Sequence, residues 1–182
     1  MGLEIERKFI IPLEYHPLFI PMTGGTRQIQ AYLSDDPGRV VRVRISETPS
    51  GTSAKMTVKG RPRQGGIAKP EWEWDMPVDI VSDMIRELKP PLLDKTRHLV
   101  EHMGNTWEVD VLKVNSVPLR PPAMWQYLVT AEIEAPTVAA ARSVPLPPWT
   151  GQEVTGDTRY AMSTLVTEAA RKEAYKAAYA SR

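Results

Sequence analysis

The sequence contains no cysteine among its 182 residues. Structural disulfides, zinc–thiolate sites, iron–sulfur clusters and thiol nucleophiles are therefore excluded. A small secreted scaffold that depends on disulfides is excluded for the same reason. A chain of this length buries a substantial core without such cross-links.

Long apolar runs and an excess of one charge are absent as well. No window approaches the roughly 20 apolar residues that a membrane-spanning helix needs, and residues 1–8 are charged from the start, with no apolar signal core. The 23 basic and 22 acidic residues give a net charge of +1, which does not indicate a nucleic-acid or membrane partner. We therefore expect a cytoplasmic protein with a single domain over residues 1–182.

The sequence does contain a repeated alternation of charged and apolar residues with a period of two. Residues i and i+2 of a strand share a face, so this period predicts short strands with one charged face. Turn sequences such as Asp35-Asp36-Pro37-Gly38 separate the segments. Many short strands joined by turns favour an antiparallel sheet or barrel. The expected strands include residues 3–9, 28–33, 41–45, 56–59, 71–76, 95–97, 107–111 and 131–135.

Helical patterns are fewer. Apolar residues at helical spacing predict a helix over residues 79–89, which Pro90-Pro91 would end. Residues 164–180 are rich in alanine, glutamate and lysine, which are good helix formers, and predict a C-terminal helix. Shorter helices are expected at 12–18 and 138–142. We expect the five tryptophans to pack between the sheet and the helices.

Charge on the alternating faces is mostly of one sign within a strand. The charged face of any single strand is compatible with contact to water, but like charges at i and i+2 repel and need an opposite neighbour or a ligand. If the apolar faces turned outward under helices, the charged side chains would line a tunnel, where unpaired charge is costly. Six basic residues would then form a strong polyanion site: Lys8, Arg42, Arg44, Lys59, Lys95 and Arg97.

Pairs of acidic residues indicate a second kind of ligand. Glu4 with Glu6, and Glu132 with Glu134, would offer the oxygen ligands that a hard divalent cation prefers. Basic groups and carboxylates in one lumen point together to a metal-bound polyphosphate.

Several motifs in order resemble one family. Residues 4–9, Glu-Ile-Glu-Arg-Lys-Phe, resemble the Glu-x-Glu-x-Lys signature of the CYTH superfamily, the triphosphate tunnel metalloenzymes. The start is most similar to the bacterial inorganic triphosphatase-like branch. Further segments resemble the family's motifs in the same order: residues 30–33, 41–45, 57–60, 71–74, 95–97, 107–111, 131–134 and 148–160.

The resemblance implies an α+β fold, in which an eight-stranded antiparallel closed β-barrel has a charged lumen and helices packed outside. It implies a small-molecule triphosphate substrate bound with Mg²⁺ or Mn²⁺, and metal-dependent hydrolysis of that triphosphate. The superfamily also includes thiamine triphosphatases and class IV adenylyl cyclases. A class IV-like cyclase and a non-catalytic polyphosphate or nucleotide sensor therefore remain as alternatives. A monomer and a homodimer are both compatible with the sequence.

The resemblance also assigns expected roles to individual residues. Lys95 is the expected general base, with Tyr32 beside it, because like-charged neighbours lower a lysine pKa and a deprotonated lysine takes a proton from water. The expected metal ligands are Glu4, Glu6, Glu132 and Glu134, with Asp110 as a fifth. The residues expected to bind the phosphates are Lys8, Arg42, Arg44, Lys59 and Arg97, with Glu71 and Glu73 orienting these cations or binding a second metal.

Two segments depart from the family pattern. The hairpin between Asp110 and Glu132 is longer than expected and contains several prolines and Trp125, an insertion that could alter the substrate preference. Ala161-Met162-Ser163 stands where the family pattern leads us to expect an asparagine. The C-terminal helix carries no motif that we can assign.

Overall fold

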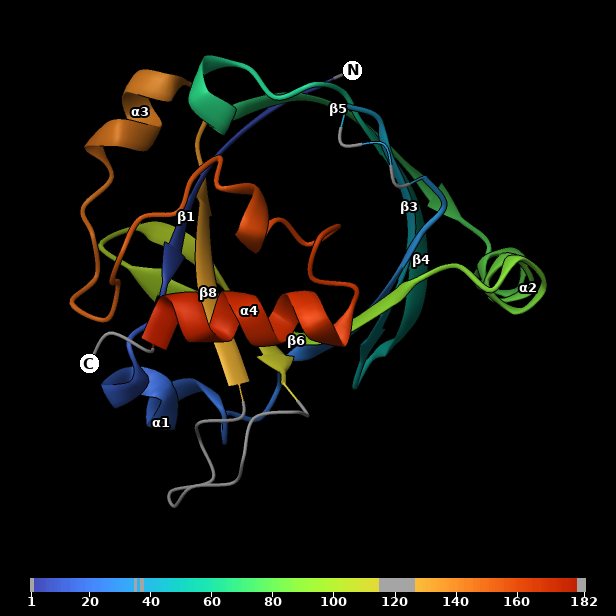
Figure 1. Cartoon of the computed structure of the whole chain (residues 1–182), viewed down its shortest axis with the longest axis horizontal. Coiled ribbons are helices and arrows are strands. Elements are labelled where there is room, and N and C mark those ends of the chain that lie inside the picture. Colours follow the sequence, from blue (N-terminus) through green and yellow to red (C-terminus); the bar gives the residue numbers. More distant parts are fainter. Residues whose placement is uncertain (1, 35, 37, 115–126, 180–182) are drawn as a thin grey trace.

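The computed structural model describes residues 2–34, 36, 38–114 and 127–179. Within these residues, antiparallel strands form a closed barrel in the order β1-β5-β4-β3-β2-β6-β7-β8 (Figure 1). The expected α+β barrel is therefore confirmed. Its strands are β1 (Gly2–Ile10), β2 (Thr26–Tyr32), β3 (Val40–Thr48), β4 (Gly51–Lys59), β5 (Ala68–Met76), β6 (Leu92–His102), β7 (Asn105–Lys113) and β8 (Tyr127–Glu134).

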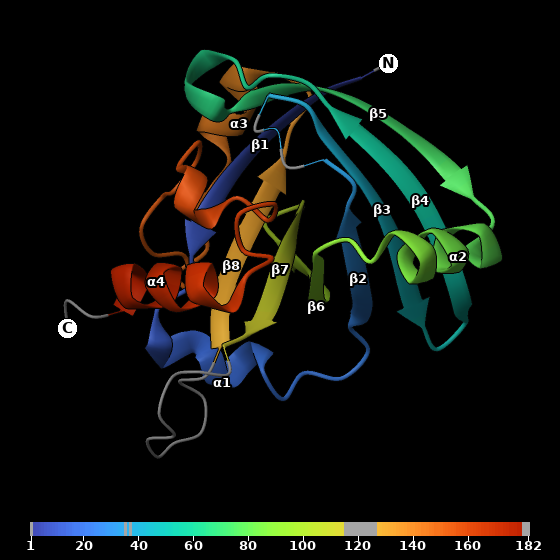
Figure 2. The ribbon, with the colours of Figure 1, turned by 45° about the vertical axis from the view of Figure 1, so that its right-hand side comes forward.

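Helices cover the apolar outer faces of the strands, whereas α4 (Glu168–Tyr179) contributes side chains to an apolar cluster inside the barrel. Helix α2 (Val78–Leu88) packs on β3 and β4, where Val81 is buried with Val43 and Ala54 (Figure 2). It ends at Lys89, which adopts the left-handed conformation with φ of 47°, directly before the two prolines. The other α-helices of the described residues are α1 (His16–Phe19), α3 (Val138–Ser143) and α4 (Glu168–Tyr179), and single turns of 3-10 helix lie at Leu13–Tyr15, Gln64–Gly66 and Thr158–Tyr160.

The register of the strands explains the period of two. Directly opposed residues of an antiparallel pair point to the same side of the sheet. Lys8 is opposite Glu132 and Arg97 is opposite Asp110, so acidic and basic side chains face each other on the lumen side. The strands predicted from alternation are confirmed, although most extend several residues further than their charged segments.

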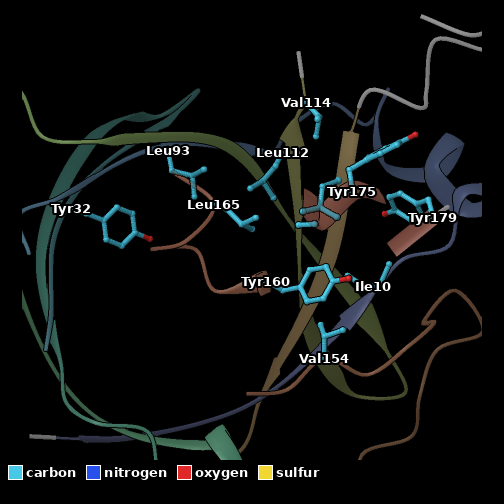
Figure 3. Close-up of a cluster of buried hydrophobic side chains, with 12 residues drawn as sticks. Ile10, Tyr32, Leu93, Leu112, Val114, Val154, Tyr160, Leu165, Tyr175 and Tyr179 are labelled. Atoms are coloured by element: carbon cyan, nitrogen blue, oxygen red, sulfur yellow. The ribbon is translucent and has the colours of Figure 1, made fainter. Parts of the chain in front are cut away.

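An apolar cluster fills part of the barrel interior (Figure 3). Leu93 and Leu112 from the strands pack there with Leu165 and with Tyr175 and Tyr179 of α4. Helix α4 is shorter than expected at its start, because residues 162–166 form turns instead. The long insertion at residues 115–126 lies outside the described residues.

The tryptophan expectation holds only in part. Trp107 and Trp149 are buried and pack edge to face, with ring centroids 5.5 Å apart. Trp74 is 52% exposed, so the expectation that it is covered by a helix is wrong. Helix α2 covers β3 and β4 and leaves the Trp74 side chain, on β5, exposed to solvent. Trp125 lies outside the described residues.

Residues 151–157, the closing segment, run along the edge of β1 that β5 does not cover. Gly151 N donates to Ile10 O at 2.8 Å, and Val154 N donates to Lys8 O at 2.8 Å. Gly156 has a φ of +76°, and a Cβ there would collide with the carbonyl oxygen of Gly65. The close approach of these two turns fixes the closing segment beside the lumen. No helix in the described ranges is long and apolar enough to span a membrane.

Candidate active site

The lumen contains a cavity of about 1420 Å³ that is lined by many charged side chains of both signs together with apolar ones. This is more room than the roughly 300–1,000 Å³ of an ordinary small-molecule pocket. Every residue expected from the sequence to serve the site lines this cavity, with the exception of Asp110. The lining members of that set are Glu4, Glu6, Lys8, Tyr32, Arg42, Arg44, Lys59, Glu71, Glu73, Lys95, Arg97, Glu132 and Glu134.

Asp110 lies behind the cavity wall and joins two of its cations. Its side chain is fully buried and its Oδ2 accepts a hydrogen bond from Lys95 Nζ at 2.6 Å. Arg97 binds both carboxylate oxygens, with Nε 2.8 Å from Oδ1 and Nη2 2.7 Å from Oδ2. This bidentate geometry is the strong form of an arginine–carboxylate pair. Both oxygens of Asp110 are therefore committed to protein cations.

Glu108, two residues earlier on β7, faces the cavity instead of Asp110. It pairs with Arg97, and burial raises its pKa above the usual value. We did not assign Glu108 a role from the sequence, nor Lys69, which binds Glu6 at 2.7 Å. The signal was present, because Glu108 shares the alternating face of Asp110 and Lys69 shares that of Glu71.

The ammonium group of Lys95 is held in unusual surroundings. Its side chain is 1% exposed, and burial together with the nearby Arg97 guanidinium lowers its pKa to about 7, against the opposing effect of Asp110. The neutral amine of Lys95 is therefore more accessible than that of an ordinary lysine. A lysine at the cavity wall with such a pKa is suited to accept a proton.

Tyr32 lines the same cavity but does not share a hydrogen bond with Lys95. Its hydroxyl donates to Gln30 Oε1 at 3.0 Å, and Figure 3 shows the ring extending from the wall into the barrel interior. Burial raises the pKa of Tyr32 to about 12, so the phenol remains protonated near neutral pH. The structure thus brings Lys95 and Tyr32 to one cavity, each with a different partner.

The cations that line the cavity fall into two groups. Lys59 and Lys8 are held by carboxylates, with Lys59 Nζ 2.6 Å from Glu4 Oε1 and Lys8 Nζ 3.0 Å from Glu132 Oε1. Arg42 has no ion pair among the described residues, and Arg44 pairs with Glu73 at the longer distance of 3.3 Å. Nε of both arginines is buried without a hydrogen-bond partner there. These two arginines are the groups best placed to receive phosphate oxygens.

Glu134 has several other carboxylates of the lumen in its surroundings. Partial burial and the nearby carboxylates of Glu108, Glu4 and Glu6 raise the pKa of Glu134 to about 7. Glu134 forms no ion pair within the described part of the chain. Such crowding of like charges is relieved by a hard divalent cation, which prefers carboxylate oxygens. The donor set therefore fits a hard divalent cation in its chemistry.

The carboxylates are not already grouped as a metal site. Among the described residues, no three acidic or histidine side chains stand close enough together to hold an ion. Glu4 and Glu6 bind Lys59 and Lys69 instead. A metal ion would have to exchange these lysine partners for itself.

Comparisons with known proteins agree with this geometry. No protein-family model matches the chain. It is 34% identical over 167 residues to an inorganic triphosphatase of Acetivibrio thermocellus, covering 91% of this chain and 94% of the relative. It is 29% identical to an inorganic triphosphatase of Nitrosomonas europaea, covering 89% of this chain and 95% of that relative.

Solved structures share the barrel. The crystal structure of the inorganic triphosphatase NE1496 matches with a TM-score of 0.52 and 26% identity, covering 91% of this chain and 95% of that chain. The PH1012 protein from Pyrococcus horikoshii shares the fold, with a TM-score of 0.53 at 16% identity, over 76% of this chain and 83% of that chain. A closed antiparallel barrel with an ion-paired, charged lumen defines the tunnel class that the CYTH superfamily represents. Within that superfamily, this chain belongs to the inorganic triphosphatase family.

Proposed function

We propose that this chain hydrolyses inorganic triphosphate to orthophosphate and pyrophosphate inside the barrel. The observation that carries the proposal is the set of eight basic side chains lining one cavity, two of them arginines whose Nε groups have no partner in the described part of the chain. The 34% identical relative is named an inorganic triphosphatase, which supports the same substrate.

The phosphate chain would lie against the basic side chains of the lumen. Arg42 and Arg44 offer planar donor groups that bind phosphate oxygens in pairs, whereas Lys8 and Lys59 act as point charges. We propose that Glu134, Glu4, Glu6, Glu132 and the newly found Glu108 hold the divalent cation, Mg²⁺ or Mn²⁺. When bound, this cation neutralises phosphate charge and orients the chain for attack.

Lys95 is the proposed general base. A water oxygen attacks the terminal phosphorus, the bond from that phosphorus to the bridging oxygen breaks, and pyrophosphate leaves with the electron pair. The proton of the attacking water passes to the neutral Nζ of Lys95. Arg97 binds the same Asp110 as Lys95 and also pairs with Glu108 and Glu132. It would stabilise the negative charge on the equatorial oxygens after exchanging one of these carboxylates for a phosphate oxygen.

The proposal is tested by a product assay on inorganic triphosphate, thiamine triphosphate and ATP, each with Mg²⁺ or Mn²⁺. We expect the largest kcat/KM for inorganic triphosphate, with equal amounts of orthophosphate and pyrophosphate. A cyclic nucleotide and pyrophosphate from ATP would identify a cyclase instead. Tight binding of all three compounds with no product would identify a sensor.

A further inference from the structure

Gln30 is a fully buried polar residue on the lumen side of β2, with no role in the proposed mechanism so far. Its Oε1 accepts two hydrogen bonds, from the Tyr32 hydroxyl at 3.0 Å and from Arg42 Nη1 at 3.0 Å. Tyr32 and Arg42 are directly opposed in the β2–β3 pair. One amide oxygen therefore connects two side chains that line the cavity.

Arg42 depends on this contact for its orientation. Its side chain is partly buried, its Nε has no hydrogen-bond partner, and no carboxylate pairs with it within the described ranges, so the hydrogen bond to Gln30 is what holds it there. A neutral amide oxygen fixes the direction of the guanidinium but leaves its positive charge uncancelled. A carboxylate at this place would fix Arg42 equally well and would remove the net charge that attracts phosphate.

We infer that Gln30 is a positioning residue, which directs Arg42 toward the phosphate chain and ties the Tyr32 hydroxyl to the same oxygen. The inference rests on the proposed function in that the anion tested is inorganic triphosphate. It also explains why Tyr32 and Lys95 have separate partners, because Tyr32 belongs to the group that orders the arginine. Preorganising a donor in this way reduces the entropy lost when the anion binds.

The first test compares Gln30→Met with Gln28→Met by calorimetric titration of inorganic triphosphate. Methionine has nearly the length and volume of glutamine but cannot accept the two hydrogen bonds. Gln28 is the matched control, because it is buried on the same face of β2 and makes no hydrogen bond to Arg42 or Tyr32 among the described residues. We expect Gln30→Met to weaken triphosphate binding about 3- to 10-fold, as for one lost hydrogen bond, and Gln28→Met to change it less than about 2-fold. Equal effects of the two variants would overturn the inference.

A double-mutant cycle separates positioning from a general structural effect. In the Arg42→Ala background, Gln30→Met is expected to have less than about 2-fold further effect on affinity, because the group that it positions is gone. The full effect of Gln30→Met persisting without Arg42 would show that Gln30 acts by another route.

The second readout needs no ligand. Nitrogen-15 NMR of arginine side chains reports how freely the Arg42 guanidinium rotates, and we expect faster rotation in Gln30→Met and wild-type behaviour in Gln28→Met. Unchanged Arg42 signals in Gln30→Met would overturn the inference even if no variant bound triphosphate. If the Arg42 signals change in Gln30→Met but the wild-type protein binds no triphosphate, the proposed function is contradicted and the positioning role of Gln30 is not.

If Gln30→Met does not fold, Gln30→Glu tests whether Gln30 positions Arg42. It keeps an acceptor for Arg42 and Tyr32, so the Arg42 signals should stay close to those of the wild type. Its added negative charge should cancel that of Arg42 and weaken triphosphate binding at least about 10-fold. Wild-type affinity in Gln30→Glu, or a freely rotating Arg42, would contradict the assigned role.

Discussion

Lys95 Nζ lies 2.6 Å from Asp110 Oδ2 within the barrel wall, and Asp110 holds Arg97 through the same carboxylate. One buried acid thus serves two cations of the site. This arrangement places Asp110 under the cavity rather than on it, and leaves Glu108 as the carboxylate of β7 that faces the lumen.

Asp110→Asn should therefore destabilise the fold far more than Glu108→Gln. Removing one partner from a buried ion pair leaves uncompensated charge and lowers the free energy of unfolding by about 3–5 kcal/mol. Arg97 keeps Asp110 and Glu132 as partners when Glu108 is neutralised, so about 1 kcal/mol or less is expected there. Urea unfolding of the two variants measures both values. Equal losses would show that Asp110 is not the anchor of these cations.

The pH dependence of turnover tests Lys95. Burial, followed by the charge of Arg97, lowers the pKa of Lys95 to about 7, so the neutral base becomes more abundant as the pH rises through that value. We expect kcat/KM to rise with pH near 7 and then to level off. Bound triphosphate favours the ammonium form, so the corresponding rise in kcat should occur at higher pH.

Lys95→Ala provides the matching variant. It should lower kcat more than it raises KM, and it should flatten the rise of activity with pH. A normal kcat with an unchanged pH profile would leave Lys95 as a phosphate-binding cation only. A loss seen almost entirely in KM would lead to the same conclusion.

Glu134→Gln is the cleanest test of the metal. Glu134 has no ion-pair partner in the described part of the chain, so no lysine or arginine there loses a partner when Glu134 is neutralised. Glu4→Gln and Glu132→Gln, by contrast, also remove partners of Lys59 and Lys8. We expect Glu134→Gln to keep its stability within about 1 kcal/mol and to need at least about 10-fold more Mg²⁺ for half-maximal activity.

The control for this variant is Glu47→Gln, an exposed carboxylate that pairs with Arg27 outside the lumen. Its Mg²⁺ requirement should equal that of the wild type. Full wild-type activity in excess chelator would contradict the whole metal assignment, and an unchanged Mg²⁺ requirement in Glu134→Gln would remove Glu134 from it.

Gly156→Ala tests how the closing segment is fixed. Gly156 and Gly104 have nearly the same φ, +76° and +75°, but only Gly156 would bring a Cβ into contact with another turn. Alanine at either position lowers the free energy of unfolding by about 1 kcal/mol because of the left-handed backbone. At Gly156 the collision lowers it by about 1–3 kcal/mol more. Thermal unfolding should therefore show a clearly lower Tm for Gly156→Ala than for Gly104→Ala. Equal Tm values would mean that the two turns move apart without cost.

Much of the fold can be predicted from the sequence because charge alternation shows which residues share a face of each strand. Lys8 and Glu132 share a face because each belongs to a run with a period of two, and pairing the runs puts them opposite each other. The extent of β4 and β6 beyond their charged segments was not readable, since their outer residues lack the alternation. The start of α4 was placed early, because helix-forming composition does not distinguish a helix from the turns before it.

The sequence predicts which residues line the site, but it does not predict the contacts between them. Period two assigns Asp110 and Glu108 to one face of β7, yet it does not tell that Asp110 is buried beneath Lys95 and Arg97 while Glu108 lines the cavity. The hydrogen bonds of Gln30 to Arg42 and Tyr32 could not be predicted from the sequence either. A hydrogen bond between an amide and an arginine on the next strand produces no charge pattern. Contacts of this kind depend on the closed barrel, which only the three-dimensional structure supplies.

The most direct test of the account is hydrolysis of inorganic triphosphate in water labelled with oxygen-18, followed by phosphorus-31 NMR with Mg²⁺ present. Attack by water on the terminal phosphorus, assisted by Lys95, places the label in orthophosphate and leaves pyrophosphate unlabelled. The account predicts this distribution, with turnover lost on adding chelator. Label in pyrophosphate, or no hydrolysis of triphosphate by the wild-type chain with Mg²⁺ or Mn²⁺, would contradict it.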